Sequence, residues 1–150
     1  MELKKEITIP IFVMIRTRGG DFCYNNEEFQ QMKEQLLEFK KVGADGFVFG
    51  ILDGNLEVNF IQNKELVELA DGIPCTFHRA FDRVKDYHKS LEEIIKCGFK
   101  TILTSGTKSN VSEGKEILKT LIKISNERID ILCGGGLRST NISEIKNYTK

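Results

Sequence analysis

The chain has 150 residues, of which 40% are hydrophobic and 29% charged, as is usual for a soluble globular domain. Lys plus Arg and Asp plus Glu number 22 each, so the chain lacks the basic excess of a nucleic-acid-binding domain. No apolar run approaches the roughly 20 residues that span a membrane, and residues 1–6 lack the apolar core of a signal peptide. We therefore expect a cytoplasmic protein that binds neither nucleic acid nor membrane.

Short apolar runs with strand-forming residues alternate with segments that have the apolar spacing of amphipathic helices. The predicted strands begin near Ile11, Gly46, Pro74, Thr101 and Ile129. The predicted helices cover residues 27–41, 64–70, 91–97, 113–126 and 140–147. Asn63, Ser90 and Ser112 are the expected N-caps of the three middle helices, and Gly98 is expected to end the third helix.

Five strand–helix units in series predict an α/β fold with a parallel sheet. No linker or low-complexity tract interrupts them, so we expect residues 1–150 to form a single domain. A closed (β/α)₈ barrel needs eight such units and about 250 residues. An open doubly wound sheet of five strands also fits this length, and the pattern alone leaves both architectures open.

Charged side chains follow the first predicted strand, where parallel α/β folds place their chemistry. Arg16 and Arg18 form a fork suited to carboxylate or phosphate oxygens, and Asp21 is placed to hold one arginine. Gly19 and Gly20 permit close approach of a ligand to the backbone. A structural ion pair that stabilises the loop is the alternative interpretation.

An imidazole, a guanidinium and a carboxylate follow the third predicted strand, as His78, Arg79 and Asp82. Side chains alternate along a strand, so His78 and Arg79 point to opposite faces, and we favour His78 on the inner face with Phe77 packed outside. His78 is then a candidate acid, base or metal ligand, although a buried structural histidine remains an equal alternative. Asp82 is placed to orient either the imidazole or the arginine fork. His88 is expected at the surface.

Two further strand ends are suited to anion binding. Ser105 ends the fourth strand and offers a hydroxyl and a backbone N–H, but without a G-x-S-x-G elbow it is not a nucleophile. Gly134, Gly135 and Gly136 follow the fifth strand and precede a short helix, an arrangement whose N–H groups favour an anion. They do not form a G-x-G-x-x-G dinucleotide motif. A tight turn is the alternative reading of the glycines.

The four cysteines are Cys23, Cys75, Cys97 and Cys133, and no two of them form a C-x-x-C pair. A cytosolic protein keeps such thiols reduced. The simplest interpretation is four small buried hydrophobic side chains. The alternative is that thiols near strand ends meet in space and bind a soft metal.

Five motifs in order resemble the CutC family, which is named for copper homeostasis. They begin at residues 13–24 and 43–50, continue through residues 76–82 and 103–106, and end at residues 134–137. Thr17 departs from the proline usual in the family. The resemblance implies strands three to seven of a TIM-type barrel, without counterparts of the first two units or the eighth strand. It also implies a role with Cu(I), for which Cys75 and Cys133 are the candidate ligands here.

Three hypotheses follow. The first is a copper-homeostasis protein. The second is a TIM-barrel enzyme acting on a small anionic metabolite, with catalytic roles for His78, Asp82 and Arg16. Its ligand would be bound by Arg18, Asp21, Arg79, Ser105, Gly134, Gly135 and Gly136. The third is an inactive, incomplete barrel, whose open sheet edges a second copy of the chain would cover.

Overall fold

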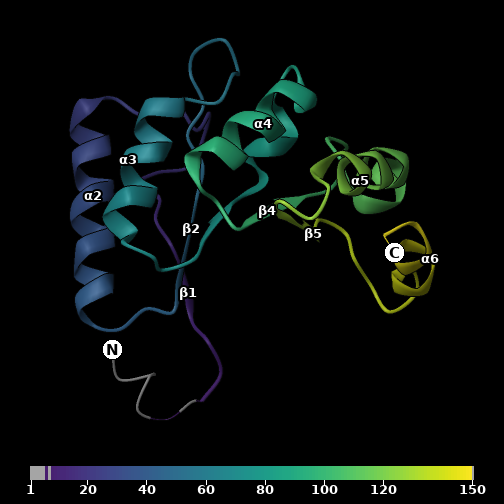
Figure 1. Ribbon diagram of the computed structural model, residues 1–150, viewed down its shortest axis with the longest axis horizontal. Coiled ribbons are helices and arrows are strands. Elements are labelled where there is room, and N and C mark those ends of the chain that lie inside the picture. The colour runs from purple at the N-terminus through teal and green to yellow at the C-terminus, as the bar shows by residue number, and fades with distance from the viewer. Residues whose placement is uncertain (1–5, 7, 150) are drawn as a thin grey trace.

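The computed structural model describes residue 6 and residues 8–149, so residues 1–5, the larger part of the segment inspected for a signal peptide, lie outside it. Five parallel strands form one sheet in the order of the chain (Figure 1). They are β1 (Phe12–Met14), β2 (Gly46–Phe49), β3 (Cys75–Phe77), β4 (Thr101–Thr104) and β5 (Asp130–Cys133). This sequential order is that of a barrel, since a doubly wound sheet reverses its order at a switch point. The predicted partial TIM barrel is therefore confirmed.

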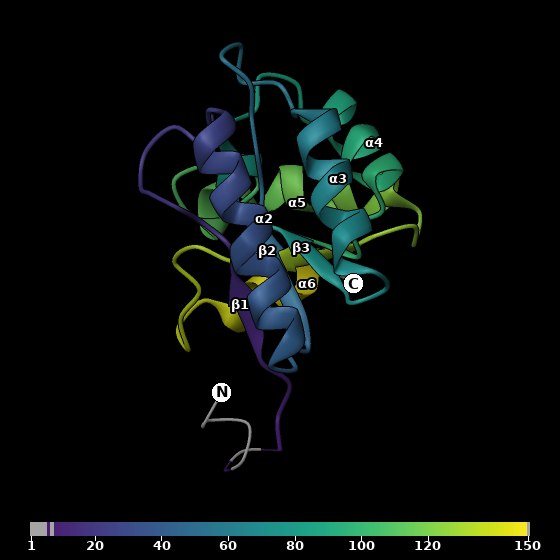
Figure 2. The same cartoon turned by 90° about the vertical axis from the view of Figure 1, so that its left-hand side faces the viewer.

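Helices surround the outside of the curved sheet (Figures 1 and 2). They are α2 (Asn26–Lys41), α3 (Phe60–Ala70), α4 (Tyr87–Cys97), α5 (Val111–Ser125) and α6 (Ile142–Tyr148), with a 3₁₀ helix, η1 (Arg79–Arg83), directly after β3. Asn25 caps α2 through a capping box with Glu28, and Gly98 ends α4 in the left-handed conformation with φ of 97°. Within the described residues, none of the helices combines the length and apolarity needed to cross a membrane.

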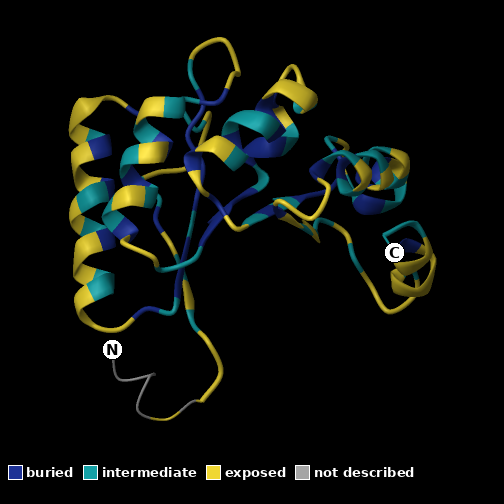
Figure 3. Ribbon diagram, in the orientation of Figure 1, coloured by how far each residue is buried: buried dark blue, intermediate teal, exposed yellow. Residues whose placement is uncertain are grey.

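The hydrophobic core lies between the outer face of the sheet and the helices, as the predicted alternation of side chains along the strands requires. Phe47, Phe49 and Phe77 are fully buried against the helices, so the expectation that Phe77 packs outside is confirmed. The inner face is open (Figure 3): Phe12, Met14 and Leu132 are 46%, 55% and 53% exposed. A hollow of about 500 Å³ lies along this face, lined by side chains from all five strands.

Three predicted helix starts were wrong, because the true caps lie two to four residues earlier. Asn59, Asp86 and Asn110 cap α3, α4 and α5. Asn63 is instead fully buried inside α3, where its side-chain amide accepts a hydrogen bond from Ile51 N and donates one to Ile51 O. Ser90 and Ser112 lie within the first turns of α4 and α5. Polar side chains near a helix start satisfy tertiary partners as readily as they cap.

One close approach between backbones holds α5 against the end of β4. A Cβ atom added to Gly114 would lie 1.8 Å from Ser105 O, and one added to Gly106 would lie 2.3 Å from Gly114 O. Backbone contact at this distance leaves no room for any side chain. The loop at the end of β4 is thereby fixed in position.

We predict that Gly114→Ala lowers the free energy of unfolding by about 3 kcal/mol, because overpacking displaces backbone rather than a flexible side chain. Gly54→Ala is the matched control, since no atom lies within 4 Å of the Cβ that it adds. Urea denaturation followed by circular dichroism measures both. Equal stability of the two variants would show that α5 does not depend on this contact.

Candidate functional site

Side chains that follow β1 and β3 on the inner face of the sheet meet beyond the C-terminal ends of these strands. Arg16 follows Met14 on the inner face, and His78 follows Thr76 in the same way. Together with neighbouring side chains they surround a pocket of about 180 Å³. We call it the strand-end pocket; its lining residues are Met14, Arg16, Phe22, His78, Arg79 and Leu103. The favoured inward placement of His78 agrees with this arrangement.

His78 is held in one orientation by contacts on several sides. Its ring is 4% exposed and lies edge-on to Phe22, with 4.9 Å between ring centroids. Ala80 N–H donates to Nδ1 at 3.2 Å, as the first capping bond of η1. Gly50 leaves room for the ring, because a Cβ there would lie 2.8 Å from Nδ1.

The charge state of His78 follows from this burial. Desolvation first, and the nearby Arg16 charge second, lower the pKa of His78 to about 4. The imidazole is therefore neutral at pH 7. Its Nε2 atom is buried and has no hydrogen-bond partner within the protein.

Unpaired polar atoms are concentrated at this end of the sheet. Among the described residues, five buried side-chain nitrogen or oxygen atoms have no hydrogen-bond partner. Four of the five belong to Arg16 (Nε), Thr17 (Oγ1), Tyr24 (OH) and His78 (Nε2). Because buried polar groups are normally paired, this concentration makes the C-terminal end of the sheet a candidate binding site.

Arg16 lines the pocket, and Tyr24 lies close to Arg16. The Arg16 guanidinium lies over the Phe22 ring, 4.4 Å from its centroid, and its Nη2 donates a hydrogen bond to Gly20 O at 3.4 Å. Tyr24 is 7% exposed, and burial raises the pKa of its hydroxyl while the Arg16 charge opposes the rise. Tyr24 was not among the residues predicted for the site. Tyr24 is separated from Arg16 by a loop, so the inspection of residues that directly follow the strands did not identify it.

Asp82 fixes the second arginine of the pocket. The Asp82 side chain is 7% exposed and accepts from Arg79 Nε at 2.7 Å. It also accepts from Thr104 Oγ1 at 2.5 Å and from the backbone N–H groups of Ser105 and Thr107. Asp82 therefore joins η1 to the loop after β4 and orients Arg79. The expectation that it orients His78 or the Arg16/Arg18 fork was wrong.

Ser105 and the glycine run complete the surroundings of Arg79. Arg79 Nη2 donates to Ser105 Oγ at 2.8 Å. A Cβ on Gly135 would lie 2.8 Å from Arg79 Cζ, so Gly135 makes room for the guanidinium. Gly135 and Gly136 have positive φ values of 101° and 77°, as a tight turn requires. The predicted residues of three strand ends are thus brought together around Arg79.

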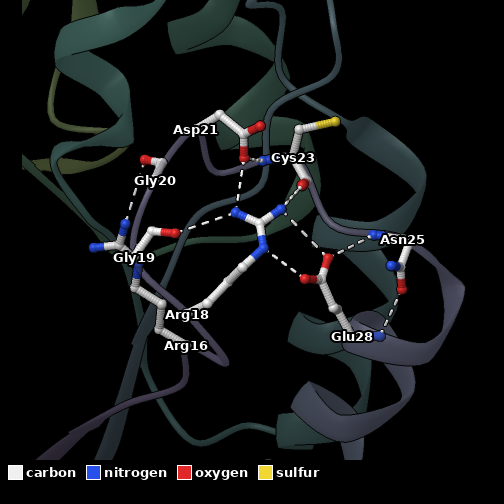
Figure 4. A network of polar contacts seen from close by, with 8 residues as sticks. All are labelled: Arg16, Arg18, Gly19, Gly20, Asp21, Cys23, Asn25 and Glu28. Atoms are coloured by element: carbon white, nitrogen blue, oxygen red, sulfur yellow. Dashed lines mark hydrogen bonds and ion pairs between the residues drawn. The ribbon is translucent and has the colours of Figure 1, made fainter.

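Arg18 and Asp21 lie outside the pocket, in a network that secures the loop before α2 (Figure 4). Arg18 Nε donates to Glu28 Oε1 at 2.5 Å, Nη1 to Asp21 Oδ1 at 3.0 Å and Nη2 to Cys23 O at 2.7 Å. These contacts raise the pKa of Arg18 and contribute to the lowered pKa of Asp21 and Glu28. Of the expected arginine fork, only Arg16 reaches the strand-end pocket.

The cysteines do not gather into a metal-binding group. Cys75 lies at the start of β3 and Cys133 at the end of β5, both on the outer face, with β4 between them. Strand spacing and register put their Cα atoms roughly 15 Å apart. Burial raises the pKa of Cys75 to about 12 and also raises that of Cys133. The described part of the chain has no cluster of three or more His, Cys, Asp or Glu side chains suited to a metal ion.

The exposed position predicted for His88 is confirmed: it lies on the surface of α4, where its ring stacks on Tyr87. The two histidines of the chain therefore differ in exposure: His88 lies at the surface and His78 is buried at the strand ends.

Comparison with known proteins agrees with the motifs. Proteins named copper homeostasis protein cutC homolog from Mus musculus and Homo sapiens are 43% and 41% identical over 145 residues, 95% of this chain and 53% and 52% of theirs. A CutC family protein of Vibrio campbellii is 39% identical over 148 residues, 97% of this chain and 60% of its own. The chain thus spans about half the length of the curated relatives it matches.

A solved structure extends the agreement to the fold. The crystal structure of CutC from Streptococcus agalactiae matches with a TM-score of 0.92 and 34% sequence identity, covering 99% of this chain and 72% of that one. The model of the CutC family matches residues 1–150. With its motifs, its parallel sheet and its relatives all in agreement, this chain belongs to the CutC family.

Proposed function

We propose that the strand-end pocket binds a small anionic metabolite, a carboxylate or a phosphate ester. The observation that carries this proposal is a pair of buried polar atoms without a hydrogen-bond partner, Arg16 Nε and His78 Nε2, which belong to two residues that line the pocket. Leaving a buried donor unpaired costs about 1–3 kcal/mol. Oxygen atoms of a bound anion would accept these hydrogen bonds and remove that cost.

Charge and shape support the same ligand class. Arg16 and Arg79 both line the pocket, while the carboxylate of Asp82 is already paired with Arg79 and with donors from Thr104, Ser105 and Thr107. Two guanidinium groups attract an anion and repel a cation. Met14, Phe22 and Leu103 supply an apolar wall for the carbon atoms of the ligand.

Catalysis would extend this proposal from binding to an enzyme on a TIM-type scaffold. His78 would act as the acid/base group, Arg16 would stabilise negative charge and Asp82 would keep Arg79 in place. Ser105 and Gly134 to Gly136 would support Arg79 from the far side, and Arg18 and Asp21 would fix the loop that presents Arg16. An incomplete barrel without activity of its own is the competing proposal, since the relatives are about twice as long.

Copper handling is the second candidate function, because the mammalian relatives are named copper homeostasis proteins. A reducing cytoplasm, which we propose as the location, keeps thiols available for Cu(I). The donor set does not fit well: Cys75 and Cys133 lie apart under the outer helices, and burial disfavours their thiolate forms. The strand-end pocket, lined by two cations, is no better suited.

The open inner face supports self-association. Phe12, Met14 and Leu132 expose apolar surface on a face that barrels normally enclose. We extend the proposal to a second copy of the chain that covers this face and the two sheet edges. Sedimentation equilibrium measures this directly, and a monomeric mass at micromolar concentration would contradict it.

We predict that Arg16→Gln weakens binding of pyruvate or inorganic phosphate by about tenfold or more, as expected when a charge-assisted hydrogen bond is lost. Isothermal titration calorimetry at constant ionic strength measures the affinities. Arg83→Gln is the matched control, since Arg83 is an exposed arginine at the end of η1 and lines no part of the pocket. An equal loss of affinity in both variants would show that only the overall positive charge matters, and it would contradict the proposed site.

For copper we expect only the weak binding of accessible thiols when the purified chain is titrated with Cu(I) against a competing chelator under reducing conditions. The reason is the separation of Cys75 from Cys133 and the raised pKa of both. Tight one-to-one binding that disappears in Cys75→Ser or Cys133→Ser would instead establish the copper function in this part of the family fold.

A further inference from the structure

The backbone fixes which nitrogen of His78 carries the proton. A backbone amide can only donate a hydrogen bond, and Ala80 N–H is directed at Nδ1 at 3.2 Å. Nδ1 must therefore be the unprotonated acceptor. In the neutral ring the proton then lies on Nε2, which makes the unpaired Nε2 atom a hydrogen-bond donor.

We propose that His78 serves the strand-end pocket as a neutral hydrogen-bond donor, whose Nε2–H, together with the Arg16 guanidinium that lines the same pocket, binds an oxygen of a carboxylate or phosphate ligand. The inference rests on the proposed anion site and defines its chemistry. The site then recognises acceptor oxygens with donors only. This donor role replaces the acid/base role given to His78 in the catalytic extension above, because Ala80 N–H occupies Nδ1 and Nε2 carries the proton.

Burial and the neighbouring charges favour the neutral ring, although a backbone hydrogen bond at His78 itself raises the pKa of the ring. The charged groups that line the pocket with His78 are the cations Arg16, after β1, and Arg79, in η1. Phe22 and Phe77 cover the ring with apolar edges, and Gly50 lies against Nδ1. No carboxylate lines the pocket to stabilise an imidazolium. The lowered pKa of His78 agrees with this environment.

The same geometry is unfavourable for a metal at His78. A metal-bound histidine normally donates its other ring N–H to an acceptor. Here the other nitrogen accepts from Ala80, so coordination through Nε2 would require an imidazolate or the loss of that capping bond. A neutral donor needs neither change, and it matches a ligand whose oxygen atoms lack protons.

Nitrogen-detected NMR of the two histidines tests the inference in the ligand-free chain. His88→Gln removes one of the two sets of imidazole signals and so assigns His78. We expect a neutral ring with a protonated Nε2 and an unprotonated Nδ1 from about pH 5.5 to 8.5. A protonated Nδ1, or an imidazolium at pH 7, would overturn the inference whether or not an anion binds.

Addition of pyruvate then separates this inference from the proposed function. We expect the Nε2–H signal of His78 to move downfield. We also expect the affinity for pyruvate to change by less than about twofold over the same pH range. Binding that leaves Nε2–H unchanged, or that falls about tenfold per pH unit, would overturn the donor role while leaving the anion site standing. No response of any signal near the pocket to pyruvate or inorganic phosphate would overturn the anion site, and the donor role with it.

A pair of variants adds an independent readout. His78→Gln retains a side-chain N–H donor and should keep pyruvate affinity within about fivefold, whereas His78→Leu should lose at least about tenfold. Circular dichroism confirms that each variant is folded. Equal affinity of the two variants would contradict a donor at this position.

Discussion

The packing of aromatic side chains on the outer face of β2 and β3 is the constraint on which the site depends. Phe49 and Phe77 both contact Phe99, with ring centroids 5.0 Å and 5.3 Å apart, and none is more than 2% exposed. A strand that slipped by one residue would turn this cluster toward the open face and expose it to water. Burial of the phenylalanines therefore also directs Thr76 and His78 inward.

The side chains of the pocket are held in position by polar contacts between the strand-end loops as well as by the strands. Asp82 unites the end of β3 with the end of β4, and Arg79 is placed by Asp82, Ser105 and Gly135. The Asp82 side chain is 7% exposed and that of Arg79 is 41% exposed, so loss of Arg79 would leave a buried carboxylate without its cation. The two arginines of the pocket also differ: Arg79 has several protein partners, while Arg16 retains an unpaired buried Nε.

Much of the fold could be predicted from the sequence, because strand and helix periods and the CutC motifs are local signals. The five strand positions and the terminator Gly98 belong to this class. The partners of polar side chains could not be predicted, since they depend on residues far along the chain. Arg18 meets Glu28 ten residues on, Asp82 meets Thr104 22 residues on, and Asn63 pairs with Ile51 instead of capping a helix.

The central claim is that an oxyanion binds among Arg16, His78 and Arg79. A crystal structure of the chain grown with selenate, with anomalous data collected at the selenium edge, tests this most directly, because the anomalous signal marks the anion without reference to the protein. The account predicts a peak in the strand-end pocket within hydrogen-bonding distance of the Arg16 guanidinium and His78 Nε2. Peaks confined to surface lysines, with none in the pocket, would contradict it.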